Sequence, residues 1–150
     1  MNLLFDTNIL IHLAKDYSLK LLQQVNTNSD KVFISVVTVG ELKSIALQNN
    51  WGPRKLNLVD VLLEEILIVE ISENLIDTYA QIDAYSQCKN PSFDNYPHQT
   101  ARNMGKNDLW IASTAALLGL TTVTTDADFD HLNGVFFDVR KINPAEFKVR

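Results

Sequence analysis

The sequence has little cysteine, no long apolar run and no excess of positive charge, and each lack excludes a class of protein. Its 150 residues include one cysteine, Cys88. A single cysteine excludes an intramolecular disulfide, and no second cysteine or histidine stands near Cys88 at metal-ligand spacing. This composition suits a reducing compartment such as the cytoplasm.

Long apolar runs are absent. The first apolar run, Leu3–Phe5, ends after three residues and follows no basic segment, which is unlike a signal peptide. The other runs are far shorter than the roughly 20 residues that a membrane helix needs. We therefore expect a soluble, cytoplasmic protein that forms one domain over residues 1–150, with no membrane partner.

Positive charge is in deficit. The chain has 13 Lys and Arg against 18 Asp and Glu, for a net charge of −5. Proteins that bind nucleic acid usually carry a basic face. Local patches matter more than the total, however, because salt screens charges over about 8–10 Å. The deficit therefore does not exclude a protein that acts on nucleic acid.

Short apolar or β-branched runs alternate with segments of helical periodicity. We predict strands at residues 2–5, 32–37, 67–71, 121–125 and 135–139. We predict helices at residues 8–14 and 19–25, from the second strand to about 48, from 53 onwards, and at 75–88, 108–118 and 128–132. This alternation favours a three-layer α/β fold, in which helices flank a central parallel sheet.

Four carboxylates stand where a predicted strand ends or a predicted helix begins: Asp6, Glu41, Asp108 and Asp126. The ends of parallel strands gather at one edge of a sheet, so acids far apart in sequence can meet there. Carboxylates brought together repel one another unless a cation lies between them, and ligands that offer only oxygen favour Mg²⁺ or Mn²⁺. The pattern therefore indicates a metal-dependent enzyme acting on phosphates.

Each acid also has a structural interpretation. Asp6 suits the N-cap of the helix that follows it, and Glu41 fits a capping box that begins at Thr38. Asp108 and Asp126 stand at helix starts, which the helix dipole favours for any acid. Asp128 also lies close enough to Asp126 in sequence to compete for its role. The order of the four acids is therefore more informative than any one of them.

The local signatures support this order. They are Asp6-Thr7-Asn8, Gly40-Glu41-Leu42, Asn107-Asp108-Leu109 with Ile111-Ala112 and Thr114-Ala115, and Thr124-Thr125-Asp126 with Asp128-Phe129. In this order and over nearly the whole chain, they resemble the PIN-domain ribonucleases. The strongest likeness is to VapC-type toxins of bacterial toxin–antitoxin pairs. The resemblance implies a PIN-like fold and an endoribonuclease that uses Mg²⁺ or Mn²⁺.

The resemblance also implies roles for individual residues. Asp6, Glu41, Asp108 and Asp126 match the family's catalytic and metal-binding acids, and the auxiliary positions are Thr7, Asn8, Thr125 and Asp128. The expected products carry a 5′-phosphate and a 3′-hydroxyl. The expected partners are an RNA substrate, a cognate antitoxin protein and a second copy of the chain in a homodimer.

The polar segment 90–106 is longer than the connection that many relatives have before Asn-Asp. Lys89, Arg102 and Lys106 are candidates for RNA contacts, interleaved with the aromatic side chains of Phe93, Tyr96 and His98. The alternative interpretation is a solvated, partly ordered loop.

Other functions remain open from the sequence. A phosphatase of the haloacid dehalogenase type would need a second aspartate at the position of Asn8. A PIN-fold module that binds RNA or assembles without cleaving it is a further alternative. So is an RNA-processing nuclease that is not a toxin.

Overall fold

The computed structural model describes residues 1–147, in which five strands form one sheet. The strands are β1 (Leu3–Phe5), β2 (Val32–Ser35), β3 (Leu67–Val69), β4 (Thr121–Thr124) and β5 (Val139–Lys141). They lie in the order β3-β2-β1-β4-β5, and each neighbouring pair is parallel. The predicted parallel sheet is therefore confirmed.

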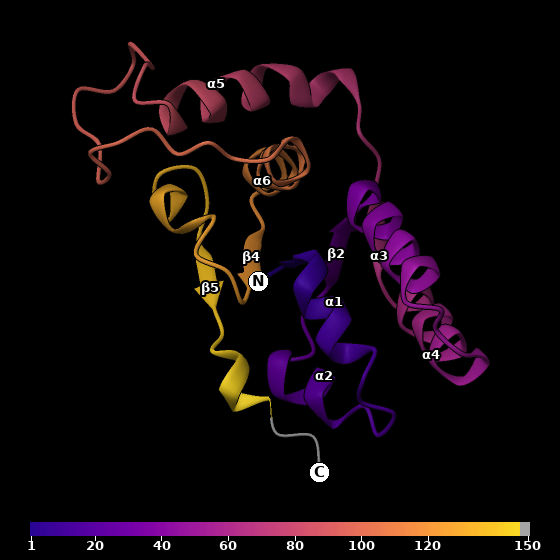
Figure 1. The fold of residues 1–150 in the computed structure, drawn as a ribbon. Coiled ribbons are helices and arrows are strands. Elements are labelled where there is room, and N and C mark those ends of the chain that lie inside the picture. The colour runs from indigo at the N-terminus through magenta and orange to yellow at the C-terminus, as the bar shows by residue number, and fades with distance from the viewer. Residues whose placement is uncertain (148–150) are drawn as a thin grey trace.

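Helices connect the strands (Figure 1). They are α1 (Thr7–Leu13), α2 (Lys20–Val25), α3 (Val36–Gln48), α4 (Pro53–Glu64), α5 (Ile76–Ser86) and α6 (Lys106–Leu118), with 3-10 turns at Glu73–Leu75, Asp130–Leu132 and Pro144–Glu146. Within residues 1–147, none of these helices has the length and apolar character needed to cross a membrane.

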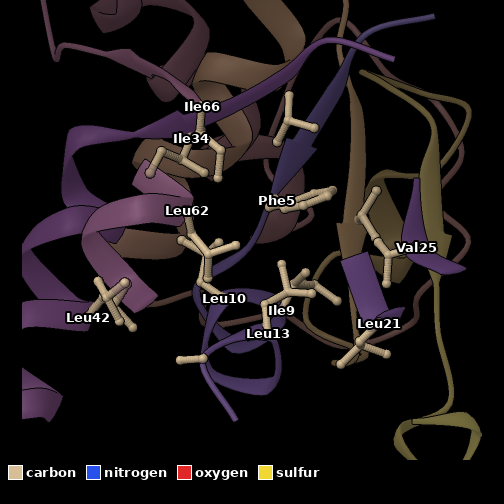
Figure 2. Close-up of a cluster of buried hydrophobic side chains, with 14 of the residues drawn as sticks. Phe5, Ile9, Leu10, Leu13, Leu21, Val25, Ile34, Leu42, Leu62 and Ile66 are labelled. Carbon is tan, nitrogen blue, oxygen red and sulfur yellow. The ribbon is translucent and has the colours of Figure 1, made fainter. Parts of the chain in front are cut away.

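The two faces of the sheet carry separate cores, because successive side chains of a strand point to opposite faces. Leu3 and Phe5 of β1 belong to a cluster with side chains of α1, α2, α3 and α4 (Figure 2). Leu4 belongs instead to a cluster with side chains of α5 and α6. Helices thus cover both faces of the sheet, which gives the predicted three layers.

The order in which strands are added reverses at the centre of the sheet. β1 is followed outward by β2 and β3, whereas β4 returns to the other side of β1. In open parallel sheets the crevice at such a reversal, outside the carboxyl ends of the strands, is the usual ligand site. Asp6 directly follows β1, and a single residue separates Asp126 from the end of β4, so both acids stand at this crevice.

The second strand ends earlier than its β-branched residues predict. The predicted strand extended to Val37, but β2 ends at Ser35 and α3 begins at Val36. The Ser35 hydroxyl accepts a hydrogen bond from the Val37 N–H at 3.1 Å and thereby caps the helix. The cap and the packing of α3 together stabilise the helix more than the strand propensity of Val36 and Val37 opposes it.

The strand predicted at residues 135–139 is also misplaced, since β5 spans Val139–Lys141. Gly134 has a φ of 73°, and the N–H groups of Val135 and Phe136 both donate to the carbonyl of Leu132. This turn directs the apolar residues 135–137 away from pairing with β4. Phe137 is buried in the second core instead.

Thr122 of β4 offers a test of the packing. Its side chain is fully buried, and its hydroxyl has no hydrogen-bond partner among residues 1–147. Because an unpaired buried hydroxyl costs about 1 kcal/mol or more, we expect Thr122→Val to stabilise the protein by about that amount. Chemical denaturation would measure the change, and a loss of stability would show that the hydroxyl has a partner.

Candidate functional site

Asp6 is held at the end of β1 by two hydrogen bonds. The side chain is 4% exposed and forms the N-cap of α1, where one carboxylate oxygen accepts from the Thr7 N–H at 2.8 Å. The other oxygen accepts from the Thr124 hydroxyl at 2.8 Å. Capping and a site at the sheet edge are therefore compatible roles for one carboxylate.

Glu41 does not form the predicted capping box. α3 begins at Val36 with Ser35 as its N-cap, so Thr38 and Glu41 both lie inside the helix. The Glu41 carboxylate instead accepts a hydrogen bond at 2.8 Å from the hydroxyl of Thr7, which is the residue after Asp6. The capping interpretation is wrong, and Glu41 is directed to the crevice beside β1.

Asp126 is connected to the first helix. Its carboxylate accepts from the Asn8 side-chain amide at 2.7 Å, and the Asn8 side-chain oxygen accepts from the Thr125 N–H at 3.3 Å. Thr125 therefore contributes its backbone to this link. Asp130, a third acid of the same stretch, forms an ion pair with Lys141 at 2.7 Å.

Thr124 has a place in the site that the sequence analysis missed. Its hydroxyl donates to Asp6 and accepts from the Asp126 N–H at 3.1 Å, so it lies between two of the four acids. The signal was its position as the last residue of the strand before Asp126. The side chain of Thr125, one residue later, makes no such contact among the described residues.

The acids interact electrostatically. Burial raises the pKa of Asp6 to about 6, against the hydrogen bonds from Thr124 and Thr7 that lower it, and the charges of Asp126 and Glu41 raise it further. Burial also raises the pKa of the Asp108 carboxyl, to about 7. The further causes at Asp108, in order, are the charges of Asp6, Asp128, Glu41 and Asp126. The four predicted acids and Asp128 thus form one cluster.

This acid cluster has no positive partner in the part of the chain that the structure describes. The ion pairs there are Met1 with Asp30 and Lys141 with Asp130, both outside the cluster. Oxygen ligands that repel one another without a counter-charge fit a hard divalent cation. Within residues 1–147, however, no three such side chains already stand close enough to hold one ion. Side-chain rotation would have to complete the site.

A groove passes over the acid cluster. Three adjoining hollows form it, of about 260, 470 and 500 Å³. The first lies between residues 101–105 and Asp128, and it shares Gly105 and Asp108 with the second. The second shares Glu41 and Asn107 with the third, which continues along α3 to Gln48. Glu41, Asp108 and Asp128 therefore line an open groove, which an extended polymer can enter, whereas Asp6 and Asp126 line none of the three hollows.

Two of the three predicted RNA-contact residues line this groove. Arg102 lines the first hollow with Asp108 and Asp128, and Lys106 lines the second with Glu41 and Asp108. Lys89 is exposed and lines none of the three hollows. Positive charge thus stands beside the acid cluster, although the chain as a whole is acidic.

The segment between α5 and α6 is packed through an aromatic cluster, which neither interpretation of its sequence anticipated. The Tyr85 ring lies 4.7 Å from that of Phe93, 5.1 Å from that of Tyr96 and 5.5 Å from that of His98. The Tyr96 hydroxyl also donates to the Asn90 carbonyl at 2.9 Å. Phe93 and Tyr96 are therefore half-buried and His98 is buried against Tyr85, so these rings anchor the segment, although most of its other residues are exposed.

The sequence is similar to a known protein family and to named members of it. Residues 3–135 match the PIN domain family. Ribonuclease VapC2 of Haemophilus influenzae is 25% identical over 123 residues, which cover 82% of this chain and 85% of that protein.

Solved structures agree on the fold. DNA-bound VapBC from Salmonella typhimurium superposes with a TM-score of 0.73 at 21% identity, covering 94% of this chain and 98% of the other. VapBC2 from Rickettsia felis, bound to a promoter DNA fragment, gives a TM-score of 0.72 at 19% identity and the same coverage. With the family match over most of the chain, the parallel sheet and the acids at its carboxyl edge are those of a protein that belongs to the PIN domain family.

Proposed function

We propose that the chain is a divalent-metal-dependent endoribonuclease. The observation that carries the proposal is the clustering of Asp6, Glu41, Asp108 and Asp126, with a raised pKa at two of them and no ion-pair partner within residues 1–147. The Haemophilus influenzae relative is named as a ribonuclease, which supports RNA as the substrate.

Asp6, Asp108 and Asp126 would hold Mg²⁺ or Mn²⁺, with Glu41 binding the ion directly or through a water. A bound divalent ion supplies positive charge that stabilises the phosphate during hydrolysis and lowers the pKa of water. The other side chains hold the acids in place. Thr124 and the Thr7 N–H orient Asp6, and Asn8 orients Asp126.

Glu41 is suited to accept the proton of the attacking water. The Thr7 hydroxyl fixes one of its oxygens at 2.8 Å, and the other oxygen is left to accept. The water oxygen forms a bond to phosphorus as the bond to the 3′ oxygen breaks, and solvent protonates the leaving oxygen. The products carry a 5′-phosphate and a 3′-hydroxyl, and no side chain acts as a nucleophile.

Arg102 and Lys106 would contact the RNA backbone in the groove. A cation at a phosphate neutralises charge and positions the strand, but it does not read sequence. Their place on either side of Asp108 would hold two phosphates near the acid cluster. Lys89 lies outside the groove, so it is a weaker candidate for an RNA contact than its sequence position alone suggested.

The experiment is cleavage of a panel of tRNA, rRNA and mRNA with Mn²⁺ or with EDTA. We expect specific fragments with Mn²⁺ and none with EDTA. Asp6→Asn should be inactive, because asparagine keeps the helix cap but removes the charge. Asp130→Asn serves as the matched control, since Asp130 pairs with Lys141 outside the cluster. Full activity in EDTA or in Asp6→Asn would refute the proposal.

Thr124 provides a further prediction. We expect Thr124→Val to lower RNA cleavage by about 10–100-fold, because losing a hydrogen bond that orients a metal ligand has effects of that size. Thr122→Val is the control, since Thr122 is equally buried on the same strand but has no contact with an acid. Equal activity of the two variants would exclude an orienting role for Thr124.

We infer that the nuclease is the toxin of a toxin–antitoxin pair. VapBC toxin–antitoxin systems are among the solved structures that share the fold, which supports an antitoxin as partner. The inference predicts a small protein encoded beside this chain whose tail occupies the acidic groove. A gene with no such neighbour, whose expression leaves growth unaffected, would favour an RNA-processing nuclease.

A homodimer is part of the same inference. Exposed apolar side chains stand in the edge strand β3 and at the start of α5, with Leu67 at 50%, Ile68 at 46% and Ile76 at 56% exposure. Apolar side chains that gather on a surface often mark a protein contact. In α4, Leu58, Val59 and Leu62 are buried in the first core and are not available for such a contact. Light scattering of the wild type and of Ile68→Lys tests the dimer. We expect a dimeric wild type and a monomeric variant. A monomeric wild type would contradict the inference.

A further inference from the structure

The first hollow of the groove takes no part in the hydrolysis itself, beyond the phosphate contact proposed for Arg102, which lines it. It has a volume of about 260 Å³ and is lined by residues 101–105, which form its wall, and by Asp108 and Asp128. The wall is fixed to the end of α5, because the Arg102 N–H donates to the Ser86 carbonyl at 2.7 Å. The hollow is therefore a preformed space next to the acid cluster, with polar and apolar sides.

The side chains of this wall mostly offer hydrogen-bond donors. The Asn103 side-chain oxygen already accepts from the Gln87 amide at 2.9 Å, which leaves the Asn103 amide nitrogen as the free group. The Arg102 guanidinium adds further donors and forms no ion pair with residues 1–147. Asp128 also lines the hollow and offers an acceptor, and the Met104 thioether provides an apolar surface.

We propose that this hollow binds the base of a ribonucleotide next to the scissile phosphodiester and that Asn103 makes it selective for guanine. The inference rests on the proposed nuclease function. Guanine presents two acceptors, O6 and N7, that match the donors of the wall. Its N1–H and N2–H groups can donate to Asp128, and its ring can pack on Met104.

Gln87 is the residue that excludes adenine. An asparagine with both amide groups free can pair with adenine, accepting from N6 and donating to N7. Here Gln87 occupies the oxygen of Asn103, so the N6 amine of adenine would meet donors only. Gln87 acts through Asn103 and is a positioning residue.

The test uses short RNA oligonucleotides that are identical except for one base beside the cleavage site. We expect the wild type to cleave the guanine substrate about tenfold more efficiently than the adenine or uracil substrates. Asn103→Asp offers an acceptor in place of the donor and should reverse this preference towards adenine. Asn95→Asp adds the same charge to the same segment outside the hollow and should keep the wild-type preference.

The Gln87→Ala variant is a second, independent test of the base preference. It should raise kcat/KM for the adenine substrate several-fold while that for guanine stays within about twofold, because the freed Asn103 oxygen can then accept. A purely structural role for Gln87 would lower both values together. Thermal unfolding of each variant shows that it is folded.

Two outcomes would overturn the inference: cleavage by the wild type without base preference, or an unchanged preference in Asn103→Asp. If the wild type cleaves no RNA, the proposed function fails, and binding of free nucleotides decides the inference separately. Addition of GMP, but not UMP, should then shift the Asn103 side-chain amide signal in an NMR titration. No shift with GMP would refute the guanine site.

Discussion

Replacing Asp108 by asparagine will make the protein more stable and less active. We expect kcat/KM for RNA to fall by at least about a hundredfold, since loss of a metal ligand should cost no less than loss of its supporting contacts. We also expect the melting temperature of the metal-free protein at pH 8 to rise by roughly 3 °C or more. The Asp108 carboxylate is charged at that pH although burial and four neighbouring acids oppose the charge, and asparagine removes this cost.

The opposite signs of the two effects make the result diagnostic. A substitution that only damaged the fold would lower both activity and melting temperature. Asp130→Asn, which breaks the ion pair with Lys141, is the matched control and should leave activity unchanged. A destabilised Asp108→Asn protein, or one that cleaves RNA at the wild-type rate, would contradict the claim that Asp108 belongs to a metal-binding acid cluster.

Metal binding should stabilise the protein in a pH-dependent way. Asp6 and Asp108 have pKa values of about 6 and about 7 in the folded protein, against 3.8 for an ordinary aspartate. A raised folded pKa contributes stability that is fully present below the unfolded pKa and is lost as pH rises through the folded value. The metal-free protein should therefore lose stability between about pH 4 and pH 7 through these groups.

Mn²⁺ should reverse this loss where the acids are charged. At pH 8 and a concentration well above its dissociation constant, we expect Mn²⁺ to raise the melting temperature by roughly 5 °C or more. At pH 5 protons compete for the same oxygens, so the rise should be about 1 °C or less. Thermal unfolding measures both, with Asp108→Asn as the variant that should not respond. Equal rises at pH 5 and pH 8 would place the ion elsewhere.

Three acids of the cluster were predictable from the sequence because Asp6 and Asp126 follow strands and Asp108 lies in the first turn of a helix, whereas Glu41 lies inside α3. Parallel strands bring such positions to one edge whatever the details of the loops. The hydrogen bonds that hold these acids in place were harder to predict from the sequence. Thr124 precedes Asp126 by two residues, but only the packing of β4 against β1 reveals that its hydroxyl reaches Asp6.

The errors in the fold have a common cause, which is competition between local propensity and long-range packing. Val36 and Val37 favour a strand, yet a serine cap begins α3 there. Residues 135–137 read as a strand, yet Gly134 turns the chain and places Phe137 in the core. The segment between α5 and α6 is polar in sequence, and its order depends on the ring of Tyr85, which contacts aromatic residues far along the chain.

Calorimetric titration of Mn²⁺ at pH 6.5, repeated in buffers of different ionisation enthalpy, tests the central claim that these acids form a metal site. At that pH Asp6 and Asp108 are partly protonated, so binding should release about one proton per ion. The Asp6→Asn and Asp108→Asn variants should bind much more weakly. Binding without proton release, or wild-type affinity in both variants, would contradict the account.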